Sequence, residues 1–216
     1  MNPVTSSDTV ATNRPSQPGE PTWEVAEFFP RQGDWTEADY LALDTGRLVE
    51  LSDGRLEVLP MATVLHQLIV AFFYNQLHSF VQARGVGTVL FAPLPVRLWP
   101  GKYRQPDVVF LGEGRVRDPH GQPDGADLVV EVVSDGEENR RRDLVLKRAE
   151  YATARISEYW IVDPAEHRIL VLVLEGDAYR EAGTFGAGQA AASELLIDFS
   201  IDVDAVFAVG DAEART

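Results

Sequence analysis

Two short apolar runs, each carrying one carboxylate, constrain the fold of this chain more than any other feature. The first comprises residues 107–111 and begins with Asp107, and the second comprises residues 128–134 and contains Glu131. Both runs are rich in β-branched residues and are bounded by Gly, Pro and Asp, a pattern typical of short strands covered on both faces. The chain is therefore expected to fold around a sheet with a helix on each face.

Glu131 needs a physical explanation because it stands among valines in a strand that is expected to be buried. Removing an unpaired carboxylate from water is costly unless a cation, a proton or a hydrogen-bond donor meets it. Two interpretations are open at this point. Glu131 either lies at a strand end, where it reaches solvent or pairs with an arginine, or it belongs to a divalent-metal site.

Composition limits the class of protein. The chain has 216 residues, which suits one domain, and no cysteine, which excludes disulfides, thiolate nucleophiles and cysteine-bound zinc. No apolar run approaches the roughly 18 residues of a membrane span and no basic, apolar leader is present, so a cytoplasmic protein without membrane contact is expected. The formal charge of −15 argues against broad affinity for nucleic acid. The local exception is a basic cluster formed by Arg140, Arg141, Arg142, Lys147 and Arg148.

The pattern along the chain predicts a disordered N-terminal tail (residues 1–22), one domain (residues 23–208) and a disordered C-terminal tail (residues 209–216). Thr36 to Asp39 resembles a helix capping box, and Asp53-Gly54 marks the turn of a hairpin over residues 48–59. Apolar residues at intervals of three and four predict a long helix over 63–84. The further predicted elements are strands at 86–91, 94–99, 158–163, 168–175 and 178–182, and helices at 138–154 and 203–208. This order predicts an α/β (α+β) fold with an N-terminal hairpin and a C-terminal β-meander.

Four charged residues could converge in such a fold: Glu50, Asp107, Glu131 and Lys147. Mg²⁺ prefers oxygen ligands and keeps several waters, so carboxylates from neighbouring strands could hold it and still leave room for a phosphate oxygen. A lysine beside them could position the attacking water and offset the charge that develops during phosphoryl transfer. The spacing alone is weakly specific, since any acidic α/β protein offers similar sets.

The sequence around these residues resembles that of the PD-(D/E)XK nuclease superfamily and, within it, the family of Uma-type putative restriction endonucleases. The resemblance covers about residues 35–206. It is carried by Val49-Glu50-Leu51, Asp53-Gly54, Pro106-Asp107-Val108-Val109, Asp127-Leu128-Val129-Val130-Glu131-Val132, Ser134, Asp143, Lys147 and Glu158-Tyr159-Trp160-Ile161-Val162-Asp163-Pro164. It implies a restriction-endonuclease-like core, Mg²⁺ (or Mn²⁺) as cofactor, and hydrolysis of phosphodiester bonds in DNA. It also implies Asp107, Glu131 and Glu50 as metal ligands.

The expected lysine is displaced. The superfamily usually has a lysine two residues after the glutamate, but Val133 occupies that position here, which makes Lys147 on the following helix the candidate. Lys147 can serve the site only if its helix packs over the sheet face that carries Glu131. The alternative is an ordinary surface pair with Asp143 four residues earlier, worth about 0.3–0.5 kcal/mol on an exposed helix.

Four further residues are weighed against structural roles. His66 opens the long helix and either supports the site or packs in the core, and Gln105 either bonds a phosphate or water or is a polar residue at a strand end. Tyr151, one turn after Lys147, is expected to pack. Trp160 is expected to belong to the strand core and not to a platform for nucleobases.

The resulting hypothesis is a Mg²⁺-dependent DNA endonuclease with Glu50, Asp107 and Glu131 on the metal and Lys147 positioning water. A homodimer is expected, because two facing subunits could cut both strands and closed two-fold dimers are the commonest soluble assembly. Two alternatives remain open: a non-catalytic binding or assembly module that retains the fold, and a metal-dependent hydrolase of a smaller phosphoester. The acidity of the chain favours these alternatives.

Overall fold

The computed structural model describes residues 28–45 and 47–210. The chain divides into two units between Arg31 and Gln32, and the account below concerns the second unit. The predicted tail at residues 1–22 lies outside the described residues, as does the predicted C-terminal tail apart from residues 209 and 210. No helix in the described ranges is long and apolar enough to cross a membrane.

A six-stranded mixed sheet forms the centre of the molecule, with the strand order β10-β9-β8-β7-β6-β3. Its strands are β3 (Gly87–Phe91), β6 (Val108–Gly112), β7 (Leu128–Val132), β8 (Glu158–Asp163), β9 (Arg168–Glu175) and β10 (Ala178–Phe185). Only the β7–β8 pair within this sheet is parallel. The predicted mixed α/β fold and the antiparallel β8–β9–β10 meander are confirmed.

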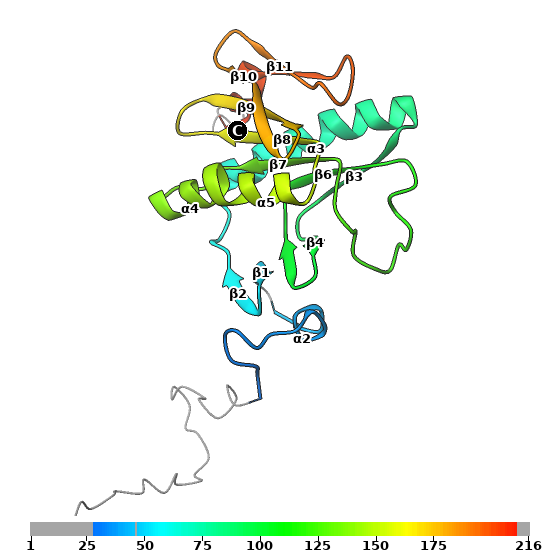
Figure 1. Cartoon of the computed structure of the whole chain (residues 1–216). Coiled ribbons are helices and arrows are strands. Elements are labelled where there is room, and N and C mark those ends of the chain that lie inside the picture. The colour runs from blue at the N-terminus through cyan, green and yellow to red at the C-terminus, as the bar shows by residue number, and fades with distance from the viewer. Residues whose placement is uncertain (1–27, 46, 211–216) are drawn as a thin grey trace, which may run out of the picture. The chain divides into compact units, whose positions relative to one another are not determined.

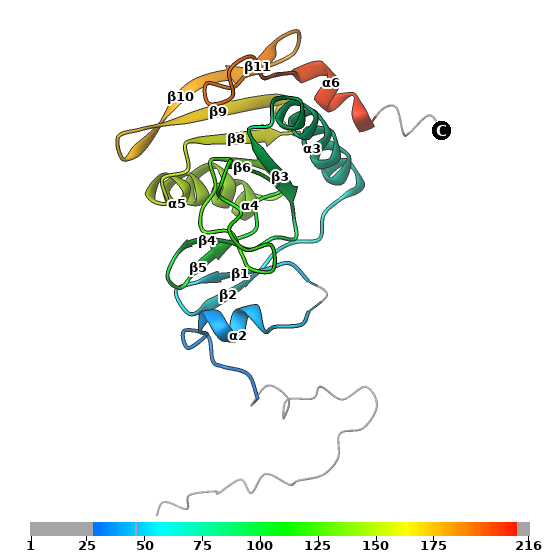
Figure 2. The ribbon, with the colours of Figure 1, turned by 90° about the vertical axis from the view of Figure 1, so that its right-hand side faces the viewer.

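Helices cover both faces of this sheet (Figures 1 and 2). On one face, α3 (Val64–Arg84) contributes Ile69, Phe73, Leu77 and Val81 to a core with alternate residues of β6, β7 and β8. On the other face, Tyr151 and Ala152 of α5 (Lys147–Thr153) pack with the intervening strand residues. Because strand side chains alternate between faces, Glu131 in β7 points to the α5 side with Val129 and Val133.

The helix that crosses from β7 to β8 contains a π turn. It consists of α4 (Glu137–Arg141), the π-helical segment η1 (Arg142–Leu146) and α5, and the Lys147 N–H donates to the carbonyl of Arg142. The sequence predicted one regular helix over 138–154. A π turn holds one more residue than an α-helical turn, so Arg142 and Lys147 lie one turn apart.

A second, four-stranded sheet carries Glu50. Its order is β2-β1-β5-β4, with β1 (Val49–Ser52), β2 (Arg55–Val58), β4 (Val96–Trp99) and β5 (Lys102–Arg104), and every pair is antiparallel.

The predicted hairpin at Asp53-Gly54 is confirmed, and both turn residues have positive φ. The capping box is also confirmed, since the Thr36 and Asp39 side chains bond each other's backbone N–H groups at the start of α2 (Glu37–Leu41). Sequence patterns missed β5 and the pair β11 (Ala190–Ala192) and β12 (Ser200–Asp202), which precedes α6 (Val203–Phe207).

The Glu158–Asp163 block is structural, as predicted for Trp160. Trp160 is buried in the core beside Phe73. Glu158 is fully buried and accepts four hydrogen bonds of 2.6–2.9 Å, from Trp160 Nε1, Ser193 Oγ and the N–H groups of Glu194 and Leu195. This carboxylate therefore fixes the start of β8 to the segment that precedes β12.

At the other end of β8, Asp163 anchors α4. Both carboxylate oxygens accept from Arg140, at 2.8 and 2.7 Å. Burial alone would raise the pKa of Asp163, but the hydrogen bonds and charge of Arg140 outweigh burial and hold the pKa below its ordinary value.

We expect Asp163→Asn to lower the free energy of unfolding by about 1.5–3 kcal/mol at pH 7, the cost of losing hydrogen bonds between charged groups. A carboxyl with a depressed folded pKa stabilises above its unfolded pKa and loses this contribution as pH falls through the folded value. The difference between variant and wild type should therefore shrink below about pH 4. Urea unfolding across this pH range measures it, with Asp177→Asn in the exposed Arg155–Asp177 pair as control. A difference independent of pH would contradict this assignment.

Candidate active site

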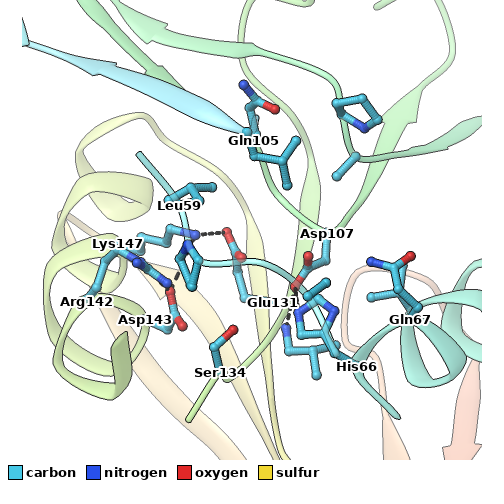
Figure 3. Close-up of a pocket in the computed structure, with 17 residues that line it drawn as sticks. Leu59, His66, Gln67, Gln105, Asp107, Glu131, Ser134, Arg142, Asp143 and Lys147 are labelled. Atoms are coloured by element: carbon cyan, nitrogen blue, oxygen red, sulfur yellow. Dashed lines mark hydrogen bonds and ion pairs between the residues drawn. The ribbon is translucent and has the colours of Figure 1, made fainter. Parts of the chain in front are cut away.

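Apart from Glu50, the predicted site residues His66, Gln105, Asp107, Glu131 and Lys147 line one cavity of about 220 Å³. The start of α3, the segment before β6, the end of β7 and the η1–α5 helix all reach it. Figure 3 shows Arg142, Asp143 and Lys147 on one side of the cavity and His66 on the other, with Glu131 and Asp107 between them. Its polar wall comprises His66, Gln67, Gln105, Asp107, Glu131, Ser134, Arg142, Asp143 and Lys147.

Asp107 and Glu131 reach the cavity from adjacent antiparallel strands. Val108 pairs with Val130, so Asp107, one residue before β6, lies next to Glu131 in the register. The Val132 N–H donates to Asp107 Oδ2 at 2.7 Å and fixes this carboxylate at the strand end. Of the four charged residues that could converge, Asp107, Glu131 and Lys147 line this cavity and Glu50 does not.

Lys147 lies in a ring of carboxylates. Its Nζ is 2.8 Å from Glu131 Oε1, 3.4 Å from Asp143 Oδ1 and 3.9 Å from Glu50 Oε1. The Lys147 side chain is 2% exposed, so its interaction with Asp143 is buried and the interpretation as a surface pair is wrong. The helix does pack over the face that carries Glu131, as the displaced lysine requires.

The pKa of the Glu131 carboxyl is raised by its surroundings. Its Oε1 forms an ion pair with Lys147 Nζ at 2.8 Å and accepts from the hydroxyl of Tyr151 at 2.5 Å. Burial raises the pKa of Glu131 to about 8, with smaller contributions from Asp107 and Asp143 and against the opposing effect of the Lys147 ammonium. Tyr151 is thus more than a packing residue, because its hydroxyl orients Glu131.

The charge of Lys147 persists despite burial. Burial alone would lower the pKa of Lys147, but the carboxylates of Glu131, Glu50 and Asp143 favour the ammonium and raise the pKa above its ordinary value. Lys147 therefore acts as a cation at neutral pH and has no free amine with which to take up a proton.

Glu50 belongs to a buried ion network behind the cavity. It is fully buried, and its Oε2 accepts from Arg104 at 2.6 Å while Oε1 accepts from the Gln105 N–H at 2.8 Å. Burial acts to raise the pKa of Glu50, but Lys147, Arg104 and the Gln105 N–H outweigh it and leave the pKa lowered. Glu50 is therefore an ionised partner for the two cations.

Arg104, which sequence reasoning missed, joins the small sheet to α5. It is 1% exposed, and its Nε and Nη2 donate to Glu150 at 2.7 and 2.8 Å. Its Nη1 donates to Glu50 and to Glu57 of β2. No local sequence signal marks this residue, because its partners are 46 to 54 positions away.

Gln105 and His66 hold the neighbouring groups in place. Gln105 Nε2 donates to the Val49 carbonyl at 2.6 Å and to the Tyr40 hydroxyl at 3.1 Å, so the amide nitrogen is engaged by the small sheet and α2. His66 Nε2 lies 3.3 Å from Asp107 Oδ2. Burial would lower the pKa of His66, but the hydrogen bond and charge of Asp107 outweigh burial and raise it.

The basic cluster predicted between residues 140 and 148 is divided. Arg142 and Lys147 line the cavity. Arg140 binds Asp163, and Arg148 donates to the Tyr179 carbonyl at 3.3 Å. Among the residues that the structure describes, no three His, Cys, Asp or Glu side chains form a group that could hold a metal ion. The metal-binding roles of Glu50, Asp107 and Glu131 therefore stay predictions.

Comparisons with known proteins agree with the fold and name the family. A crystal structure of a putative nuclease belonging to DUF820 from Anabaena variabilis is similar, with a TM-score of 0.66 and 16% sequence identity over 81% of this chain and 98% of that one. At this identity the likeness shows the fold alone. Comparison with curated proteins gave no match. The family model Uma2, described as "Putative restriction endonuclease", matches residues 37–204. The chain is therefore a member of the Uma2 putative restriction endonuclease family.

Proposed function

We propose that this protein is a Mg²⁺-dependent DNA endonuclease with a restriction-endonuclease-like core, whose site is the cavity between Asp107, Glu131 and Lys147. One observation carries the proposal. Two carboxylates from adjacent strands open into one cavity, and a buried ammonium lies 2.8 Å from one of them. Hydrolysis of a phosphodiester needs groups that hold a metal and groups that stabilise negative charge at the same place.

The free oxygens of the two carboxylates fit a hard cation. Every hydrogen bond and ion pair that Asp107 makes with the described residues goes to Oδ2, and those of Glu131 go to Oε1. Asp107 Oδ1 and Glu131 Oε2 are thus left as ligands. Mg²⁺ is commonly held by one or two carboxylates, with waters and substrate phosphates as its other ligands. Within the proposal Mn²⁺ can replace Mg²⁺, and Glu50 holds Lys147 and Arg104 instead of the metal.

The residues around this pair have distinct tasks. A bound metal ion would lower the pKa of a water and polarise the phosphate. Lys147 holds the attacking water and offsets negative charge that develops on the phosphate, while Glu50 and Asp143 hold Lys147 in its charged form. His66 and the Val132 N–H fix Asp107, and Tyr151 fixes Glu131.

Two other functions fit the same fold. The formal charge of −15 favours a non-catalytic binding or assembly module, or a hydrolase of a small phosphoester that needs no extended basic surface. Supercoiled plasmid and a small chromogenic phosphodiester, each assayed with Mg²⁺, with Mn²⁺ and with chelator, separate the three functions. Nicking that needs metal supports the proposal. Turnover of the small diester alone supports the second alternative, and no turnover of either supports the first.

We expect millimolar Mg²⁺ or Mn²⁺ to raise the unfolding temperature by several degrees. A ligand that binds only the folded state stabilises by about 2.7 kcal/mol at a hundred times its Kd. Asp107→Asn should remove this effect, and Asp118→Asn in an exposed loop is the matched control. Differential scanning fluorimetry measures it. A shift that persists in Asp107→Asn would place metal binding elsewhere.

The proposal includes a homodimer, because one site cuts one strand and two-fold symmetry supplies the second.

A further inference from the structure

Lys147 has little capacity left for a substrate. Its Nζ forms ion pairs with the carboxylates of Glu131, Asp143 and Glu50, at 2.8, 3.4 and 3.9 Å. Its side chain is 2% exposed. A phosphodiester that enters the cavity therefore needs a second cation to contact its oxygens directly.

Among the described residues that line the cavity, Arg142 is the permanent cation besides Lys147. Its Nε donates to Asp143 Oδ1 at 3.2 Å and its Nη1 donates to Asn139 Oδ1 at 3.1 Å. A guanidinium has five N–H groups, so these two bonds leave three, two of them on Nη2. Nη2 makes no hydrogen bond with the residues that the structure describes. It is also not enclosed by them, since it is absent from their buried unpaired nitrogen atoms. Because Arg142 lines the cavity, this nitrogen can donate to a ligand there while Nε and Nη1 fix the side chain.

The π turn explains how Arg142 reaches this position. In a regular α-helix, residues five apart are separated by about 140° around the axis, so Arg142 and Lys147 would face different directions. In η1 the Lys147 N–H bonds the Arg142 carbonyl, so the two residues lie one turn apart on the same side. Asp143 Oδ1 lies 3.2 Å from Arg142 and 3.4 Å from Lys147 and holds both cations. Figure 3 shows the three residues together beside Glu131.

We propose that Arg142 is a substrate-binding catalytic residue whose Nη groups bind the non-bridging oxygens of the scissile phosphate. The proposal rests on the proposed function and gives the two cations different roles. Lys147 stays with the carboxylates and the water, and Arg142 contacts the phosphate. Arginine suits this role because its planar fork matches a phosphate in a bidentate arrangement.

Binding of inorganic phosphate in the presence of chelator tests the contact without relying on cleavage or metal. We expect the wild type to bind phosphate and Arg142→Gln to bind it about tenfold or more weakly, since hydrogen bonds between charged groups contribute this much. Arg141→Gln removes the same charge from an exposed neighbour on α4 and should bind as the wild type does. Phosphorus NMR titration measures all three proteins, and circular dichroism verifies that each is folded.

The outcomes separate this proposal from the proposed function. Equal phosphate affinity in folded Arg142→Gln and wild type, or no binding to wild type at millimolar phosphate, overturns the phosphate site. Loss of binding in Arg142→Gln alone supports it even if plasmid is not cut, in which case only the nuclease proposal fails. Where plasmid is cut, Arg142→Gln should lower kcat more than it raises KM, and Arg142→Lys should restore part of the rate because it returns the charge without the fork.

Discussion

Replacing Arg104 with methionine is expected to lower the free energy of unfolding by about 3–5 kcal/mol, because removal of one partner leaves buried carboxylates without their cation. Glu50 is fully buried and, among the residues that the structure describes, would retain only the Gln105 N–H and a Lys147 ammonium 3.9 Å away. Glu150 would keep Lys102, whose Nζ lies 2.6 Å from its Oε1. The loss therefore falls mainly on Glu50. Urea unfolding at pH 7 measures the change.

Two further variants sharpen this measurement. Arg55→Met removes an exposed cation from strand β2 of the same sheet and should change stability by less than about 0.5 kcal/mol. Adding Glu50→Gln to Arg104→Met should restore part of the lost stability, because the uncompensated charge is then gone. A double variant as unstable as Arg104→Met, with an intact helix content, would show that packing of the guanidinium and not its charge stabilises this region.

Replacing Lys147 with methionine is expected to lower the rate of phosphodiester hydrolysis by about a hundredfold to a thousandfold, the usual cost of removing one charge-stabilising group from an active site. The sequence suggests a variant with an almost unchanged fold, but the buried ring of Glu131, Glu50 and Asp143 predicts destabilisation as well. The destabilisation should be smaller than for Arg104→Met. The pKa of Glu131 is already about 8, so this carboxyl can take up a proton when the ammonium is removed.

Rates must be compared at a temperature at which the variant is folded. Arg141→Met is the matched control because it removes a cation from the exposed side of the same helix. Combining Lys147→Met with Glu131→Gln should recover stability but not hydrolysis. If Lys147→Met cleaves DNA at the parental rate, then Lys147 serves only to neutralise Glu131.

The carboxylate pair was predictable because its signal is local. Asp107 and Glu131 each stand in a short β-branched run, and the antiparallel register brings the two runs together. Lys147 was proposed from the resemblance to the nuclease superfamily, and strand alternation added the condition that its helix pack over the face that carries Glu131. The cause of the raised pKa of Glu131 was less predictable, since burial contributes more than the neighbouring charge of Asp107.

The supports of the site could not be predicted, because each depends on partners far away in the sequence. Gln105 bonds Tyr40 across 65 positions, and Arg104 bonds Glu50 across 54. Arg104 lies in a strand of three residues, which is too short to show a period. The π turn is defined by a backbone hydrogen bond and leaves no pattern of side-chain types, so Arg142 could not be assigned to the cavity from the sequence.

The π turn at Arg142–Leu146 also affects how this chain is aligned with relatives. A homologue whose helix lacks it would need one residue fewer between the strand carboxylate and the cavity lysine. A search pattern with a fixed spacing between Glu131 and Lys147 would reject that homologue, and a gapless alignment on the glutamate would pair its lysine with Leu146. Profiles of this family should therefore permit a one-residue gap within 142–146, so that cavity lysines are compared with one another.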